Sequence, residues 1–386
     1  MQEKAYRRHV RWYKGVFWPC RALFRLLFGY RAHIAKELPP APYMVLANHT
    51  TDVDPILVGA SFPQHMYFVA GESVFRMGLL SRFLSRCFAP IQRIKGSTDA
   101  QSALSILRTL KAGHSVCLFP EGNKTFTGRT LPIHPATAKL VKSAGCALIT
   151  YRITGGYFTV PRWSGTVRRG RMTGGVVCVY PAHEIKQMSV EQIARAIQDD
   201  LALDAYALQK ASPIAFRGRR LAEKLETALY LCPRCGKIGT LHSKKNRFYC
   251  DCGLSMTIDA YGFFKGVSIP FETPDQWDQW QDAQMHQMAG TLAKAPAFID
   301  EGQTLYRIGP QHELIPVASG KMALYADRFV LGGITMKLSE MTGMALVQRD
   351  QIVLSCRGEF YTVASDHLRS GRKYVTLYDF LKEKSN

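Results

Sequence analysis

The feature that most constrains the fold is an alternation, between residues 41 and 208, of short apolar runs with longer segments whose apolar residues recur every three or four positions. A short, bounded apolar run is typical of a buried strand, and the longer spacing is typical of a helix. Strands that alternate with helices predict an α/β layer built on a largely parallel sheet. Strands are expected near 43–47, 66–70, 90–94, 115–119, 147–153 and 175–181, and helices near 54–61, 74–87, 98–112, 135–144 and 189–207.

A polar loop follows the first expected strand and leads into the first expected helix. It spans residues 48–55 and reads NHTTDVDP, with His49 at the strand end and Asp54 five positions later. Ligand sites of open α/β sheets form beside strand ends, where a carboxylate can hold an imidazole in one tautomer and raise its basicity. His49 and Asp54 are therefore a candidate catalytic pair. The alternative is that Asp54, which precedes Pro55, only caps the helix.

A second loop of this kind spans residues 119–125, reads FPEGNKT and follows another apolar run. With the His-x-x-x-x-Asp pair about seventy residues upstream, it resembles the glycerolipid acyltransferase family, which includes the 1-acylglycerol-3-phosphate acyltransferases. The family's first sequence block is matched by residues 48–54. Its third block, usually Phe-Pro-Glu-Gly-Thr-Arg-Ser, is matched by residues 119–125, with Asn123 and Lys124 at the Thr and Arg positions.

The second block of the family ends in an arginine after a short strand, and Arg93 supplies it. The fourth block normally has prolines in an apolar strand, whereas residues 147–152 read ALITYR. The resemblance covers about residues 40 to 208 and implies an O-acyltransferase. Such an enzyme moves a fatty acyl group from an acyl-CoA or acyl carrier protein thioester to the free hydroxyl of a lysophospholipid. The expected acceptor is 1-acylglycerol-3-phosphate, and the expected product is phosphatidate.

The resemblance also implies catalytic roles for the first loop. His49 would accept the proton of the lysolipid hydroxyl as it attacks the thioester, and Asp54 would orient the imidazole ring. A positioned base of this kind is typically worth about 10²–10⁴ in rate. No nucleophilic serine or cysteine and no catalytic cofactor are expected, because the thioester is already activated.

The later blocks would bind the acceptor. Arg93 and Lys124 would anchor its phosphate, and Gly122 would let the backbone approach the headgroup. Glu121 would hydrogen-bond the glycerol or hold Arg93 in place. Lys124 is a point charge without the bidentate fork of the arginine that the family usually has at this position.

Four of the ten cysteines are clustered in two pairs. Cys232 and Cys235 form a Cys-x-x-Cys-Gly turn, and Cys250 and Cys252 form the second pair after fourteen intervening residues. The second pair is Cys-x-Cys rather than Cys-x-x-Cys, and the two pairs on short hairpins can close a tetrahedral four-thiolate site, which predicts a zinc ribbon with a structural zinc ion. His242 is an outside candidate ligand, and a redox pair or plain core cysteines are the alternatives.

The charge of the chain is strongly positive and unevenly distributed. Its formal net charge is +20, with nine Lys or Arg against two acidic residues in 1–40, and ten against two in 210–250. Such basic regions favour an anionic membrane surface, nucleic acid or a polyphosphate substrate.

The N-terminal region has an amphipathic pattern. Trp12 and Trp18 accompany an apolar stripe and a parallel basic stripe, which predicts membrane-interface helices, and Pro19 is expected to kink or split the helix. The alternative is that the apolar stripe packs on the next domain and the arginines face solvent. The apolar stripe consists of Val10, Tyr13, Phe17, Cys20, Phe24 and Leu27.

The expected regions are 1–40, basic amphipathic membrane-interface helices; 41–208, the acyltransferase domain; 209–229, a basic helical connector; 230–262, the zinc ribbon; and 263–386, a β-rich C-terminal domain. A helical stretch that follows Trp277, Trp280 and Met285 and ends near Leu292, and a terminal helical pattern at 374–382, flank alternating runs in the last region, which is compatible with a pleckstrin-homology-like barrel. No run of apolar residues is long enough for a spanning helix, and no cleavable signal peptide is evident. A peripheral protein on the cytoplasmic face of the membrane is expected.

Two other function classes compete with the enzyme. A zinc-ribbon nucleic-acid-binding protein would need aromatic residues for base stacking inside the basic region, and the ribbon offers only Phe248 and Tyr249, which disfavours nucleic acid as a partner. The other alternative is a lipid-binding relative without catalysis.

Overall fold

The structure is a computed structural model that describes residues 3–71, 75, 79–93, 100–310, 312–367 and 370–385. The described residues form two compact units. The first unit runs to Arg219 without residues 163–165, and the second contains residues 163–165 and the chain from Arg220 onward. Among the described residues, no helix combines the length and the hydropathy needed to cross a bilayer.

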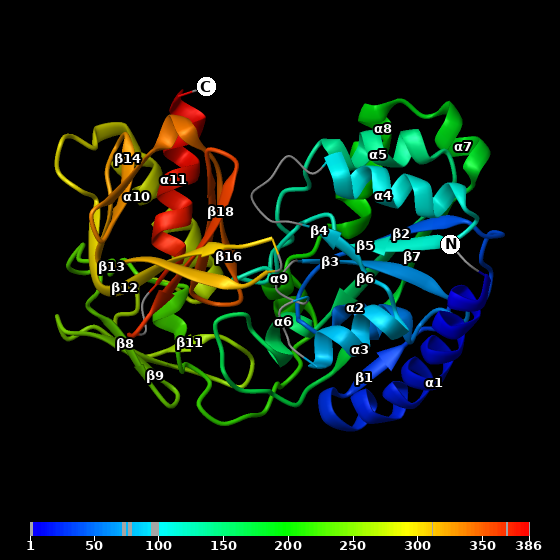
Figure 1. The fold of residues 1–386 in the computed structure, drawn as a ribbon. Coiled ribbons are helices and arrows are strands. Elements are labelled where there is room, and N and C mark those ends of the chain that lie inside the picture. Colours follow the sequence, from blue (N-terminus) through cyan, green and yellow to red (C-terminus); the bar gives the residue numbers. More distant parts are fainter. Residues whose placement is uncertain are drawn as a thin grey trace. The chain divides into compact units, whose positions relative to one another are not determined.

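The first unit is built on a seven-stranded sheet with the order β1-β7-β6-β2-β5-β3-β4 (Figure 1). Neighbouring strands are parallel except for β6 and β7, which confirms the expected α/β layer with a largely parallel sheet. The strands are β1 (Tyr30–Ala32), β2 (Tyr43–Ala47), β3 (Met66–Gly71), β4 (Ile91–Arg93), β5 (Ser115–Leu118), β6 (Ala147–Thr154) and β7 (Met172–Tyr180).

The helices expected in the first unit are present with one division, and two short helices, Gly156–Thr159 and Ala182–Gln187, were not expected. The helix expected at 189–207 is two helices, because the Asp204 side chain accepts a hydrogen bond from Ala207 N and so begins a new helix. Residues 72–74, 76–78 and 94–99, where the starts of two expected helices fall, lie outside the described residues. The helices are α1 (Glu3–Phe28), α2 (Asp54–Gly59), α3 (Leu79–Cys87), α4 (Ala100–Lys111), α5 (Ala136–Ala144), α6 (Gly156–Thr159), α7 (Ala182–Gln187), α8 (Val190–Leu201) and α9 (Ala205–Ala211).

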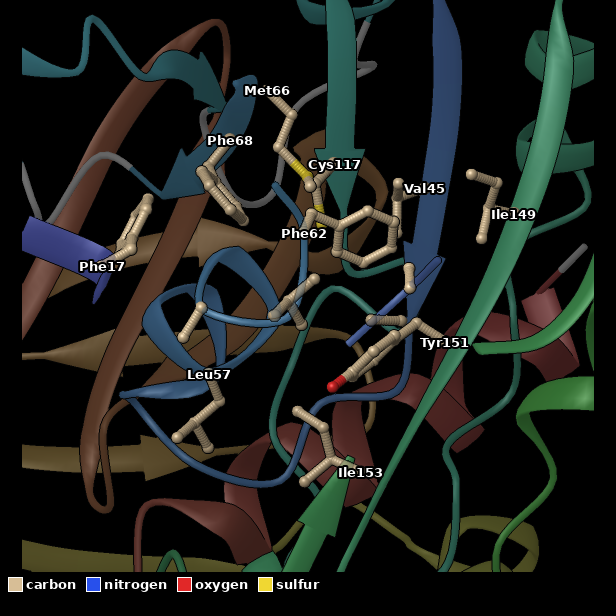
Figure 2. Packing of buried hydrophobic residues seen from close by; sticks show 14 of the residues in the cluster. Phe17, Val45, Leu57, Phe62, Met66, Phe68, Cys117, Ile149, Tyr151 and Ile153 are labelled. Atoms are coloured by element: carbon tan, nitrogen blue, oxygen red, sulfur yellow. The ribbon is translucent and has the colours of Figure 1, made fainter. Parts of the chain in front are cut away.

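Alternate residues of the central strand β2 face opposite layers of helices, as the period of a strand requires. Tyr43 and Val45 belong to a core with α1 and α2, and Met44 and Leu46 to a core with α4, α5 and α8. Figure 1 shows these two groups of helices on opposite sides of the sheet. Figure 2 shows the first core, where Val45 and Ile149 lie among the aromatic side chains. Burial of both faces holds β2 firmly, so the loop that follows it is well positioned.

The N-terminal helix bears on two expectations. α1 is continuous through Pro19, so the helix is not split there. Its stripe residues Tyr13, Phe17 and Phe24 are buried in the first core, and a Cβ atom at Gly59 would lie 2.7 Å from the Phe17 ring. This part of the apolar stripe therefore packs on the α/β layer, which was the alternative to membrane contact. The Trp18 side chain lies outside the described residues.

The chain passes from the first unit into the second in a segment that was expected to be helical. Residues 212–231 contain no α-helix, only the 3-10 turn η2 (Leu225–Thr227). Ala222 N donates to Lys245 O at 3.0 Å, and Lys224 has a left-handed backbone with φ of 71°. The prediction of a helical connector was therefore wrong, because the hydrogen bond between Ala222 and Lys245 holds this segment against a hairpin. That hairpin belongs to the antiparallel sheet β11-β10-β9-β8, with β8 (Leu241–Lys244), β9 (Arg247–Cys250), β10 (Ser255–Ile258) and β11 (Phe264–Lys265).

The rest of the second unit is a seven-stranded antiparallel sheet with the order β15-β14-β13-β12-β18-β17-β16. It consists of two meanders joined where the first strand lies beside the last. Helix α10 (Pro274–Thr291) precedes it and α11 (Arg372–Ser385) follows it. The strands are β12 (Phe298–Ile308), β13 (Leu314–Leu324), β14 (Arg328–Leu331), β15 (Ile334–Lys337), β16 (Met341–Val347), β17 (Gln351–Cys356) and β18 (Glu359–Ser365).

Candidate active site and candidate metal centre

The loop after β2 brings His49 and Asp54 together. His49 Nδ1 lies 2.9 Å from Asp54 Oδ2, and the His49 side chain is 21% exposed whereas that of Asp54 is fully buried. A carboxylate accepts hydrogen bonds, so Nδ1 carries the proton and Nε2 is left as the acceptor of the neutral ring. The pair therefore has the arrangement of a histidine base and its orienting carboxylate.

Asp54 does not cap the helix. α2 starts at Asp54 itself, its N-cap position is Val53, and no side chain caps it. The carboxylate instead accepts hydrogen bonds from the preceding backbone, from Thr50 N at 2.5 Å and Thr51 N at 2.8 Å, and from Thr51 Oγ1 at 2.5 Å. The capping alternative is therefore wrong, and these donors fix the position of the Asp54 side chain beside His49.

The second loop lies against the first because β2 and β5 are parallel neighbours, so their carboxyl ends meet at one edge of the sheet. The Phe119 ring stacks on the His49 ring, with 4.6 Å between the centroids and 28° between the planes. Thr125 N donates to His49 O at 3.2 Å. These contacts hold the imidazole ring from one side, and the hydrogen bond to Asp54 sets the orientation of the ring.

Glu121 joins the two loops through backbone groups. Its Oε1 accepts from His49 N at 2.6 Å, and its Oε2 accepts from Leu131 N at 2.7 Å. Burial raises the pKa of Glu121 to about 8, although the two N–H groups act in the opposite direction. From the sequence, Glu121 was expected to hydrogen-bond the glycerol or Arg93. The structure shows that it accepts hydrogen bonds from two backbone amides, one of which belongs to the candidate base His49.

Arg93 and Gly122 are neighbours in the structure. Arg93 ends β4, two strands away from β5. A Cβ atom at Gly122 would lie 3.2 Å from Arg93 Nη1, and the Gly122 φ of 68° is one that favours glycine. The absence of a side chain at Gly122 therefore gives the Arg93 guanidinium its place at the loop.

Lys124 pairs with a residue that the sequence reading did not select. Its Nζ lies 2.6 Å from Asp52 Oδ2, and the Lys124 side chain is 11% exposed whereas that of Asp52 is 78% exposed. Burial lowers the pKa of Lys124, and Asp52 acts in the opposite direction. Asp52 lies within the first block, between His49 and Asp54. The sequence shows this position, but it does not show that Asp52 pairs with Lys124.

Arg162 is a second residue that sequence reasoning missed. It is buried, its Nη1 donates to Lys124 O at 2.7 Å, and its guanidinium lies over the Phe126 ring at 4.1 Å from the centroid. The sequence signal was weak: a single arginine, between Pro161 and Trp163, beyond the fourth block.

Comparison with models of protein families supports the resemblance. Residues 30–154 match the model of a family described as Acyltransferase, and this range includes His49, Asp54, Arg93, Glu121 and Lys124. The first unit therefore contains an acyltransferase-family domain. Among solved structures, the chain is similar to the 1-acyl-sn-glycerophosphate (LPA) acyltransferase PlsC from Thermotoga maritima. The identity is 17% and the TM-score 0.41, over 52% of this chain and 80% of that one.

A cavity of about 660 Å³ lies at the other end of the sheet of the acyltransferase domain. Its lining includes Pro42, just before the amino end of β2, and Ala147, at the amino end of β6. His49 follows the carboxyl end of β2, so this cavity is not part of the candidate active site.

The four clustered cysteines form a candidate metal centre in the second unit. The sulfur atoms of Cys232 and Cys252 are 3.8 Å apart, as are those of Cys235 and Cys250, and all four lie within 4.8 Å of one another. A tetrahedral zinc ion with Zn–S bonds of about 2.3 Å separates its sulfurs by about 3.8 Å. Four close thiols of this geometry can hold a metal ion. His242 is not in the group, and its Nε2 lies 2.9 Å from Asp251 Oδ1.

Proposed function

We propose that the acyltransferase domain moves a fatty acyl group from an acyl-CoA or acyl carrier protein thioester to the free hydroxyl of a lysophospholipid. The expected acceptor is 1-acylglycerol-3-phosphate, which would give phosphatidate. The observation that carries this proposal is the hydrogen bond of 2.9 Å between His49 Nδ1 and Asp54 Oδ2, with His49 partly exposed beside a loop that holds Lys124.

The geometry supports a direct transfer. His49 Nε2 accepts the proton of the acceptor hydroxyl while its oxygen attacks the thioester carbonyl, and the buried charge of Asp54 stabilises the imidazolium that forms. The tetrahedral intermediate then collapses, the carbon–sulfur bond breaks, and the imidazolium returns the proton to the departing thiolate. The products are the acylated lipid and free thiol, without an acyl-enzyme.

The acceptor phosphate is proposed to bind at the loop after β5. Arg93 and Lys124 supply positive charge there, and Gly122 leaves room for the guanidinium. Glu121 holds the backbone of His49 and therefore positions the base.

Replacement of His49 by Ala tests the function. The full chain is incubated with 1-acylglycerol-3-phosphate and a long-chain acyl-CoA, and free thiol is measured together with the mass of the lipid product. We expect the His49→Ala variant to lose at least about 10²–10⁴ in kcat, because the base is gone. An unchanged melting curve would show that it folds.

His183→Ala is the matched control, because His183 is an exposed histidine on α7. It should keep the activity of the unmodified chain. Full activity of the His49→Ala variant would remove His49 from the mechanism. A panel of lysolipid acceptors and both donor types, read by product mass, then identifies the substrates.

We also propose that α1 places the protein at the cytoplasmic face of an anionic membrane. The surface that fits this role is the exposed apolar group Trp12, Leu23, Leu26 and Leu27, which are 40% to 64% exposed. An amphipathic helix that combines such residues with basic ones binds anionic lipid interfaces. The exposed basic residues of α1 are Lys4, Arg7, Arg8, Arg11, Lys14 and Arg25.

For the second unit we propose a structural zinc ion at the four cysteines and a pleckstrin-homology-like arrangement of residues 298–385. The sulfur spacing supports the first proposal. The second is supported by a four-stranded and a three-stranded meander, joined through β12 and β18 and followed by α11.

A further inference from the structure

Helix α3 carries two apolar side chains that face solvent. Leu79 is 81% exposed and Phe83 is 39% exposed. They are four positions apart, so they lie on the same side of the helix. Exposed apolar residues that gather on one surface mark a site of interaction, whereas single ones are ordinary. Whether this pair marks a site therefore depends on the exposed side chains beside it.

Helix α1 continues this apolar surface. The ring of Trp12, which is 40% exposed, meets the Phe83 ring edge to face, with 5.3 Å between the centroids. Leu23, Leu26 and Leu27 follow Trp12 after about three and four full turns, so they lie on the same side of α1. In Figure 1 both helices lie on the side of the sheet opposite to α4, α5 and α8. The exposed apolar residues of α1 and α3 therefore adjoin, and those of α3 lie within the range that matches the family model.

Arginines accompany this surface. Arg82 and Arg86 of α3 are exposed and four positions apart, and Arg8 Nε of α1 donates to Arg86 O at 3.1 Å. The basic residues of the two helices therefore adjoin as well. Helix α3 contains no acidic residue, and α1 contains only Glu3. A surface that combines exposed apolar and basic residues is complementary to an anionic lipid interface, where aromatic residues are also enriched.

We propose that α3 is a second membrane-contacting helix, which docks the acyltransferase domain on an anionic bilayer together with α1. This inference extends the proposed membrane role of α1 and does not depend on the acyl transfer. Strand β4 follows α3 and ends at Arg93, so the helix that contacts lipid leads to a residue of the candidate active site. The α1–α3 face consists of Trp12, Leu79, Arg82, Phe83 and Arg86.

Vesicle binding by the full chain tests the role of α3. The vesicles contain equal parts of phosphatidylcholine and phosphatidylglycerol, and sedimentation measures the bound protein. We expect Leu79→Glu to weaken binding about tenfold, because an apolar contact is lost and a carboxylate repels the lipid. Leu79→Trp should strengthen binding about threefold, because tryptophan favours the interface. The Arg82→Gln/Arg86→Gln double variant should weaken binding about thirtyfold, since each arginine near an anionic surface contributes about fivefold.

The matched controls lie on the other side of the sheet. Leu104→Glu changes an exposed leucine of α4, and Arg108→Gln/Arg195→Gln removes two exposed arginines of α4 and α8. Both controls should bind like the unmodified chain, because their side chains do not belong to the α1–α3 face. Melting curves show which variants fold, and Leu79→Trp and the Arg82→Gln/Arg86→Gln variant decide the outcome if Leu79→Glu does not.

Unchanged binding by the α3 variants overturns the proposal. Equal weakening in the controls overturns it too, because net charge alone would then govern binding. If Leu26→Glu in α1 weakens binding and the α3 variants do not, the membrane role of α1 stands and this inference fails. Light scattering tests a second copy of the chain as the occupant: a dimer that Leu79→Glu separates into monomers would assign the face to self-association and overturn the proposal.

Discussion

At the scale of single residues, His65 is a buried histidine outside the candidate active site. It is 8% exposed, and neither ring nitrogen has a hydrogen-bond partner among the described residues. Aromatic rings of three segments surround it. They are Tyr6, His9 and Tyr13 of α1, Tyr67 of β3, and His114, which stacks on Tyr6. Burial, together with the nearby charges of His9 and His114, lowers the pKa of His65 to about 4.

The first unit should therefore lose stability in acid. The folded-state pKa of His65 lies below its ordinary value of 6.5, so the neutral ring stabilises the fold above that value. This stability is lost as the pH falls from about 6.5 to about 4, and reaches about 3 kcal/mol at full effect. Urea unfolding of the chain, followed at several pH values, measures the loss. A His65→Phe variant should show a flatter dependence, and an equally steep one would contradict this origin.

Other residues of the candidate active site show which contacts can be predicted from spacing in the sequence and which cannot. The pairing of His49 with Asp54 could be predicted, because five positions across a strand-to-helix loop bring the two side chains close. The partners of Glu121 could not, because backbone amides at positions 49 and 131 leave no mark in the sequence. Asp52 and Arg162 were missed for the same reason, since each contributes through a contact with Lys124 from a separate segment.

At the scale of elements, some apolar residues of α1 are buried against the protein and others are exposed. Phe17 and Phe24 are buried in the core, whereas Leu26 is 64% exposed. Periodicity identified a helix with an apolar stripe, but it did not determine which members face the protein. The exposed members carry the membrane proposal.

A charge placed on the exposed face of α1 should weaken binding to lipid. We expect Leu26→Glu to reduce binding of the full chain to anionic vesicles about tenfold, because a leucine side chain contributes about 1.5–3 kcal/mol when fully buried and a carboxylate repels the lipid. Vesicle sedimentation measures the effect. Leu208→Glu, at an exposed leucine of α9, is the matched control and should bind like the unmodified chain. Equal binding by the Leu26 variant would exclude this face.

The cysteine turns of the second unit are elements that a metal ion would stabilise. We expect the purified chain to contain about one zinc per molecule, and Cys235→Ser to lose it, because three thiolates do not close a structural site. Elemental analysis measures the metal content. The melting temperature of the second unit should fall in the variant and after chelation. Cys20→Ser, at a cysteine of α1, should retain the metal, and a chain free of zinc under all conditions would contradict the assignment.

At the scale of the whole molecule, the two units divide the features that the sequence showed. The first unit contains the matched family range and the candidate active site, and the second contains the four cysteines and the antiparallel sheet. The net charge of +20 is concentrated near α1 and around the cysteine turns. Both units thus carry a basic region, and only that of α1 is combined with the exposed apolar residues of the membrane proposal.

The amino-acid sequence by itself determined the alternation of strands and helices, the two polar loops at strand ends, and the two cysteine pairs. These are local patterns, and local patterns are set by side-chain periodicity and by the short reach of a turn. The tertiary structure alone decided that the stripe of α1 packs on the sheet, that residues 212–231 are not helical, and that Arg162 reaches Lys124. Periodicity shows which residues share a face, but what covers that face depends on segments far away in the chain.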